Sequence, residues 1–437
     1  MQESAIVQPV RTIQTRIDAV NGDIITVQAD KGVAVGDMAN VGGAKAIVVK
    51  LDKGKALMQM LDGARGVSTE NEITFSGRPQ RIACSEASLG RVFNGMGDPI
   101  DNGPAVTENE QSIITPSINP TSRKVPDKMV RTGIPMIDVF NTLVESQKIP
   151  IFTTSQEPYN ELMVRIALNT DADVVVLGGI GMRFEEYDFY KTSLEAGGVF
   201  SKCAFYMHQA QDSPLIALQV PDTCLTVSEY FARQGKRVLV ILDDMTKFAD
   251  AMKEVANAMD RIPANRSYPG DLYTQLAKRY EKAVSFEDGG SVTILGVTTM
   301  PSNDVTHPVP DNTGYITEGQ FYLNEGVIQL AGSLSRLKQQ VNKKIRDDHA
   351  PIADLCAGLY ADCAEVRELR SMGFKIEEFQ EKLLIFGHKF ESRIMDLSVA
   401  MPLENALDEI WTILAETFAR EEVTIKGQLI DKYWPAV

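Results

Sequence analysis

Five apolar runs in the middle of the chain constrain its fold more than any other feature. Amphipathic stretches with helical spacing, such as residues 183–198 and 225–236, separate these runs along the sequence. Apolar strands that alternate with helices are typical of a parallel sheet covered on both faces. The sequence therefore predicts a central α/β domain with strands at 149–152, 173–179, 202–208, 237–244 and 291–300.

The regions on either side of this alternation follow different patterns. Residues 1–76 contain short β-like runs separated by Gly, Asp and Asn, which predicts a small antiparallel β-barrel. Residues 349–437 have helical periodicity and predict a helical bundle. The expected organisation is thus a barrel over 1–76, an α/β domain over 77–348 and helices over 349–437. Four apolar side chains recur at helical spacing in the last region and are expected in its core: Phe379, Leu383, Phe386 and Phe390.

Charge and cysteine usage exclude several classes of protein. The net charge of −15 argues against binding to nucleic acid or adsorption to an anionic membrane surface. No apolar run approaches the roughly 18 residues of a membrane span, and the first residues lack the pattern of a signal peptide. The five cysteines are scattered without a C-x-x-C pair, which favours free thiols. We expect a cytoplasmic protein that does not insert into a membrane.

The turn after the first central strand lacks a phosphate-binding loop. Such a loop reads G-x-x-x-x-G-K-[ST], and its backbone N–H groups and lysine surround the phosphates. Residues 153–159 read TTSQEPY, with no glycine and no lysine, and they place Glu157 where a phosphate would sit. The sequence therefore predicts that this turn does not bind Mg-ATP tightly by itself.

Two carboxylates end the fourth central strand. Asp243 and Asp244 follow an apolar run, at the edge of a parallel sheet where ligands gather. Mg²⁺ is usually held partly by substrate phosphates, so the missing phosphate loop argues against a metal here. The role of Asp243 stays open.

Several segments resemble one family, in the same order along the chain. They include GRVFNGMGDPIDNGP at 90–104, VRTGIPMIDVFNTLVESQKIPIF at 130–152, VLVILDDMT at 238–246 and RSYPGDLYTQLAKRYEKA at 266–283. THPVPDNTGYITEGQ at 306–320, SLSRL at 333–337 and RDDH at 346–349 follow. Together they resemble the non-catalytic B subunit of vacuolar/archaeal-type (V/A-type) rotary ATPases, in a bacterial variant. This family has the same three-part layout, with a RecA-like central domain.

The resemblance implies a part in an ion-pumping ATPase or ATP synthase. Three such chains would alternate with three catalytic A subunits around a central rotor stalk, with peripheral stalk subunits attached. ATP or ADP would lie at the subunit interfaces, and Mg²⁺ would be held mainly by the catalytic partner. The complex would keep the chain cytoplasmic and peripheral to the membrane. The transported ion and the direction of the reaction are not visible in this sequence.

The resemblance also assigns roles to individual residues. Catalytic relatives carry Gly-Glu-Arg where this chain has Gly-Met-Arg, and Met182 cannot align an attacking water. Arg336 resembles an arginine that reaches the γ-phosphate in the neighbouring catalytic site. Ser335 and Tyr315 are weaker candidates for the interface or a nucleotide pocket. Four further residues in matching segments are as compatible with core packing as with an interface: Arg123, Arg183, Arg266 and Tyr268.

Three other functions remain as alternatives. The first is a regulatory subunit that holds ATP or ADP without hydrolysing it. The second is an active ATPase of the same superfamily, against which the absent GK[ST] and Met182 both argue. The third is an RNA helicase-like hexamer, which the acidic balance disfavours.

Overall fold

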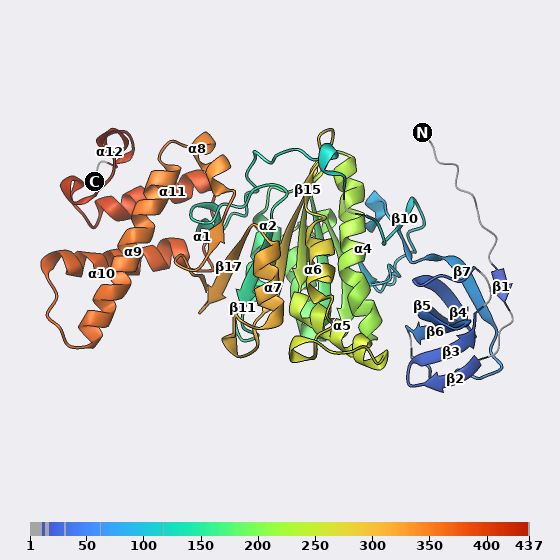
Figure 1. Ribbon diagram of the computed structural model, residues 1–437. Helices are drawn as coiled ribbons and strands as arrows, with labels where there is room; N and C mark the ends of the chain where they lie inside the picture. The colour runs from blue at the N-terminus through green and yellow to red at the C-terminus, as the bar shows by residue number, and fades with distance from the viewer. Residues whose placement is uncertain (1–10, 14–16, 30–31, 62, 117, 436–437) are drawn as a thin grey trace.

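The computed structural model describes residues 11–13, 17–29, 32–61, 63–116 and 118–435. Figure 1 shows an N-terminal sheet in blue, a central sheet flanked by helices, and a C-terminal group of helices in orange and red. This order of a β region, an α/β region and a helical region confirms the fold class predicted from the sequence. In the described part of the chain, every helix is too short or too polar to cross a membrane.

The N-terminal region is an antiparallel sheet that curls around one hydrophobic cluster. In the described residues its strands follow the order β1-β7-β4-β5-β6-β3-β2. Ile25 and Val27 of β3 point into the cluster while Ile24 and Thr26 are partly exposed, which is the alternation of a half-buried strand. The strands are β1 (Arg11–Ile13), β2 (Ile17–Asn21), β3 (Ile24–Gln28), β4 (Asp37–Val41), β5 (Ala44–Asp52), β6 (Lys55–Met60) and β7 (Ile73–Pro79).

The central region is a predominantly parallel sheet. Its main path in the described residues is β18-β17-β11-β16-β14-β12-β13-β9, with β15 and β19 attached beside β16 and β17. Its strands are β9 (Arg91–Asn94), β11 (Lys148–Thr153), β12 (Val174–Met182), β13 (Cys203–Gln209), β14 (Arg237–Asp243), β15 (Val284–Ser285), β16 (Ser291–Thr299), β17 (Gly319–Asn324), β18 (Val327–Ile328) and β19 (Leu334–Ser335). A separate two-stranded pair consists of β8 (Arg81–Ala83) and β10 (Glu110–Ser112), which come before and after β9 in the chain.

Helices cover both faces of this sheet. Val175 and Leu177 of β12 pack in one hydrophobic cluster with α2 and α3, whereas Val174 and Val176 pack in another with α4, α5 and α6. Because successive side chains of a strand point to opposite faces, one continuous apolar run serves both clusters. The helices are α1 (Pro135–Asp138), α2 (Tyr159–Asn169), α3 (Phe184–Ala196), α4 (Pro214–Arg233), α5 (Met245–Ala258), α6 (Leu272–Tyr280) and α7 (Pro308–Ile316).

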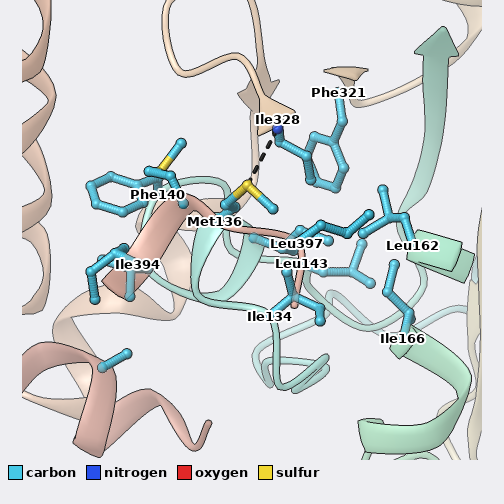
Figure 2. Close-up of a cluster of buried hydrophobic side chains, with 14 of the residues drawn as sticks. Ile134, Met136, Phe140, Leu143, Leu162, Ile166, Phe321, Ile328, Ile394 and Leu397 are labelled. Carbon is cyan, nitrogen blue, oxygen red and sulfur yellow. Dashed lines mark hydrogen bonds between the residues drawn. The ribbon is translucent and has the colours of Figure 1, made fainter. Parts of the chain in front are cut away.

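The C-terminal helices share their core with the central region. Met136 and Phe140, in and just after α1, lie in one cluster with Ile394 and Leu397 from the helical region (Figure 2). The Ile328 backbone N–H donates a hydrogen bond to the Met136 sulfur at 3.3 Å (Figure 2). The helical segments are α8 (Asn342–Ile345), α9 (His349–Ser371), α10 (Glu378–Phe390), a π-helical turn (Glu391–Met395), α11 (Leu403–Ala415) and α12 (Gly427–Tyr433).

Two side-chain predictions can be compared directly with the structure. The five cysteines are buried free thiols, as the sequence predicted. Leu383, Phe386 and Phe390 are buried, but Phe379 is 40% exposed, so its assignment to the core was wrong. Phe379 lies in the first turn of α10, and its ring lies 5.7 Å from that of the buried Phe418, measured between ring centroids.

Candidate functional site

The turn between β11 and α2 forms a closed connection instead of a phosphate cradle. The Glu157 carboxylate accepts a hydrogen bond from the Gly326 backbone N–H at 3.0 Å, which ties the turn to the hairpin of β17 and β18. Helix α2 begins at Tyr159 after Pro158, without a side-chain cap. The turn therefore presents a carboxylate where a phosphate loop presents lysine and free backbone N–H groups.

The turn after β12 also lacks the chemistry of a hydrolytic site. Met182 is 3% exposed, and its side chain packs in the hydrophobic core. The backbone N–H and guanidinium of Arg183 both donate to the Glu186 carboxylate, at 2.8 and 2.9 Å, and close the first turn of α3. A buried thioether cannot accept a proton from water. The structure thus places Met182 in packing and Arg183 in a helix cap.

The two carboxylates at the end of β14, Asp243 and Asp244, are buried and hydrogen-bonded within the chain. The Tyr190 hydroxyl donates to Asp243 at 2.9 Å. Asp244 accepts hydrogen bonds from the backbone N–H groups of Thr246 at 2.8 Å and Thr299 at 3.2 Å. Across the described ranges, no group of three or more His, Cys, Asp and Glu side chains is placed to hold a metal ion. These oxygens fit a structural hydrogen-bond network better than a Mg²⁺ site.

The electrostatics of this edge oppose phosphate binding. Burial and the nearby charge of Asp244 raise the pKa of Asp243 to about 7. Burial and the charge of Asp243 also raise the pKa of the Tyr190 and Tyr159 hydroxyls. Each of these shifts reflects a site where negative charge is already poorly tolerated. A phosphate placed here would add negative charge beside Asp243 and Asp244.

Arg336 lies at the opposite edge of the sheet. Ser335 of β19 pairs with Gly319, the first residue of β17, and the Arg336 backbone N–H donates to the Glu318 carbonyl at 3.0 Å. Glu318 precedes β17, which runs parallel to β11, so Arg336 lies beside the strands' amino ends. The side chain is exposed. Among the residues that the structure describes, its guanidinium forms no hydrogen bond or ion pair.

Tyr315 and Leu334 are exposed in segments near Arg336. Tyr315 belongs to α7 and is 75% exposed. Its neighbour Gly314 lies close to the Gln320 side chain, and Gln320 pairs with Leu334, itself partly exposed. Leu334 is thus exposed two residues before Arg336 in the chain, and the exposed Tyr315 belongs to a helix that approaches the partner strand of Leu334. Tyrosine and arginine are enriched at protein–protein interfaces.

Ser335, the other sequence candidate, is enclosed. It is 1% exposed, and its hydroxyl donates to the Thr142 carbonyl at 2.8 Å. The Gln147 side-chain amide donates to the same hydroxyl at 3.1 Å. These bonds occupy the hydroxyl inside the chain, directly before Arg336.

The remaining sequence candidates make internal contacts. Arg123 donates to the carbonyls of Ile118 and Glu281, both at 3.1 Å. Arg266, with a positive φ of 50°, donates to Asp304 at 2.8 Å from an exposed loop. Tyr268 is buried and donates to Asp250 at 2.7 Å. Arg123 and Tyr268 therefore hold loops onto the α/β core.

Comparison with known proteins agrees with this architecture. The model of the ATP synthase alpha/beta family, nucleotide-binding domain, matches residues 133–331. A V-type ATP synthase beta chain of Treponema denticola is 55% identical over 98% of this chain and 100% of its own length. Proteins of the same name from Borreliella burgdorferi and Protochlamydia amoebophila are 54% and 50% identical, over 97% and 98% of this chain and 99% of their own lengths. The chain belongs to the V-type ATP synthase beta chain family.

Membership of the V-type ATP synthase beta chain family confirms the resemblance read from the sequence. The functional reading of the residues still missed two polar side chains at the start of β11. Gln147 is buried and donates a hydrogen bond to Ser335. The buried Lys148 forms ion pairs with Glu281 at 2.6 Å and Glu318 at 3.1 Å. The available signal was a polar pair, Gln-Lys, immediately before an apolar strand in a matching segment.

Proposed function

We propose that this chain is the non-catalytic B subunit in the soluble head of a V/A-type ion-translocating ATPase or ATP synthase, and that it donates Arg336 to the ATP site of the adjacent catalytic subunit. The observation that carries the proposal is an exposed guanidinium, without a partner among the described residues, at the sheet edge opposite Asp243 and Asp244. A six-residue strand such as β11 separates these edges by roughly 20 Å. This separation supports a role for Arg336 at a site on a neighbour and not on its own chain.

The chemistry of arginine suits this role. Its guanidinium stays protonated and offers a planar set of donors, which matches the charge on a transferring phosphoryl group. An arginine supplied across an interface typically contributes about 10³- to 10⁵-fold to the rate of such a reaction. The closed turn at Glu157 and the buried Met182 support a division in which the neighbour supplies the rest of the site.

The same proposal covers the assembly. Three chains alternate with three catalytic A subunits, and Tyr315 and Leu334 contribute to the contact that presents Arg336. Such a ring is built from heterologous interfaces between unlike chains. ATP or ADP lies at these interfaces, and Mg²⁺ is held mainly by the catalytic partner, because the carboxylates of this chain are engaged internally. The head joins central and peripheral stalks and lies peripheral to the membrane on its cytoplasmic side.

A second candidate function is regulatory nucleotide binding without hydrolysis. The match to a nucleotide-binding domain over residues 133–331 favours it. Calorimetry on the isolated chain distinguishes the two functions, since heat from micromolar ATP binding supports the regulatory candidate. We expect no such heat, because the turn at Glu157 offers no cationic group to phosphate.

The proposal is tested by ATP hydrolysis of the chain alone, of its mixture with the catalytic subunit encoded beside it, and of a mixture containing Arg336→Ala. We expect a silent isolated chain, an active mixture and a nearly inactive assembled variant. ATP turnover by the isolated chain would contradict the prediction that residues 153–159 do not bind Mg-ATP tightly by themselves. An assembled Arg336→Ala complex that keeps most of its activity contradicts the arginine assignment.

A further inference from the structure

The segment that carries Arg336 is fastened to the start of β11 by a buried side-chain network. Gln147 has no exposed surface. Its amide nitrogen donates to the Ser335 hydroxyl at 3.1 Å, and its amide oxygen accepts from the Val144 backbone N–H at 2.8 Å. The Ser335 hydroxyl donates onward to the Thr142 carbonyl at 2.8 Å. A buried network whose members are all satisfied makes the local structure rigid.

A second connection reaches Arg336 from the next residue of β11. The Lys148 backbone N–H donates to the Glu318 carboxylate at 3.1 Å, and its ammonium pairs with Glu318 at 3.1 Å and Glu281 at 2.6 Å. The Glu318 carbonyl accepts the Arg336 backbone N–H at 3.0 Å. Gln147, just before β11, and Lys148, its first residue, therefore hold the side chain before Arg336 and, through Glu318, the backbone of Arg336 itself.

We propose that Gln147 is a positioning residue for Arg336, acting through the Ser335 hydroxyl. This inference rests on the proposed function. The guanidinium has no partner among the described residues, so its place in a neighbouring site depends on the backbone from which it projects. Misplacement of a reacting group by about 1 Å can cost on the order of 100-fold in rate. A fixed Ser335 limits that displacement.

The substitution that tests the role is Gln147→Met, which keeps the length of the side chain and removes both of its hydrogen bonds. We expect the assembled complex with the catalytic subunit to lose about tenfold in kcat, an intermediate loss for a displaced catalytic group. The KM for Mg-ATP is expected to stay within about twofold, because only transition-state binding is affected. Ser335→Ala removes the hydroxyl that accepts the Gln147 hydrogen bond, and we expect the same loss of kcat from it; this variant serves if Gln147→Met does not assemble. Ser335→Thr keeps a hydroxyl and should retain more activity than Ser335→Ala.

Ser228→Ala is the matched control for a general loss of a buried hydroxyl. Ser228 is fully buried in α4, and its hydroxyl donates to the Cys224 carbonyl at 2.7 Å. We expect its complex to keep the kcat of the unaltered protein. An equal loss of kcat in Ser228→Ala and Ser335→Ala would show that the Ser335 effect is only structural, and would overturn the inference.

A double-mutant cycle separates positioning from stability. We introduce Gln147→Met into an Arg336→Lys complex and follow phosphate release under single-turnover conditions over hours. If Gln147 acts through Arg336, Gln147→Met changes the phosphate-release rate of the Arg336→Lys complex by less than about twofold, because coupled residues give non-additive losses. An undiminished tenfold loss in the Arg336→Lys background overturns the inference, as does an unchanged kcat in Gln147→Met alone. An active Arg336→Ala complex overturns the proposed function instead.

Discussion

The two edges of the central sheet carry different kinds of polar side chain. At the carboxyl edge, Asp243 and Asp244 are buried and accept hydrogen bonds from the same chain. At the amino edge, Gln147 and Lys148 are also buried and satisfied, but they support a side chain, Arg336, that is exposed. The polar groups of the carboxyl edge are enclosed within the chain, whereas those of the amino edge lie beside an exposed cation.

The proposed function assigns different roles to these two edges. The carboxyl edge is where ligands bind in open α/β sheets. Here the Glu157 carboxylate, in the turn after β11, is hydrogen-bonded to Gly326, and the Met182 side chain, at the end of β12, is buried. The loss of glycine and lysine leaves the sheet intact because its strands depend on apolar packing. Arg336 lies about a strand length away from this edge.

The largest expected effect compares an arginine from each edge. Arg336→Ala should lower turnover of the assembled complex by about 10³- to 10⁵-fold, the range typical of an arginine finger. Arg183→Ala at the carboxyl edge should lower it by less than about threefold, since an exposed ion pair contributes little. Steady-state phosphate release measures both. Similar losses in the two variants would remove the functional distinction between the edges.

A smaller effect concerns the pH dependence of stability at the carboxyl edge. In the folded protein the pKa of Asp243 is raised to about 7 from an ordinary value of 3.8. Between these pH values the folded state binds the proton more tightly than the unfolded chain, so this residue lowers the free energy of unfolding as pH rises. Asp243→Asn should therefore be more stable than the unaltered protein at pH 8, by roughly 2–4 kcal/mol, and similar to it near pH 4.

Thermal and urea unfolding across pH 4 to 8 measure this difference. Asp288→Asn, at an exposed aspartate, is the control and should show no comparable change with pH. A stability gain in Asp243→Asn that is the same at every pH would contradict the role of ionisation. A loss of stability at pH 8 would show that the charged carboxylate is favourable in its buried place.

The smallest expected effect concerns the closed turn. Glu157→Ala removes the hydrogen bond to Gly326 and should lower the free energy of unfolding by about 1 kcal/mol. Gln156→Ala, at the exposed neighbouring residue, should change it by less than about 0.5 kcal/mol. Neither variant should gain ATP binding by calorimetry, because the turn still lacks glycine and lysine. Tight ATP binding by Glu157→Ala would mean that the carboxylate alone had blocked the site.

The sequence predicted the central strands well because each is a continuous apolar run. All five predicted ranges correspond to observed strands within a few residues, with β11 at Lys148–Thr153 as an example. The prediction missed β17, which alternates between buried and partly exposed residues, and the short edge strand β9. Short or alternating runs give a weak signal, and they become strands because a neighbour supplies hydrogen bonds.

The candidate site was predictable only in part. The absence of GK[ST] and the presence of Met182 are visible in the sequence, and the family resemblance pointed to Arg336. The enclosure of Ser335 was not visible, since its partner Gln147 lies 188 residues earlier in the chain. The prediction that Phe379 is buried was wrong for a related reason. Helical spacing shows which residues share a face of α10, but not which part of that face extends beyond the packed core.

The sequence by itself determined the alternation of strands and helices and the loss of the phosphate loop, because both depend on residues close together in the chain. Strand and helix periodicity follow from backbone geometry, and a phosphate loop needs specific residues at fixed spacing. Only the tertiary structure decided that Asp243 and Arg336 lie at opposite edges and that Gln147 supports Ser335. These relations depend on which strands pair and in which register, and sheet pairing joins segments that are distant in sequence.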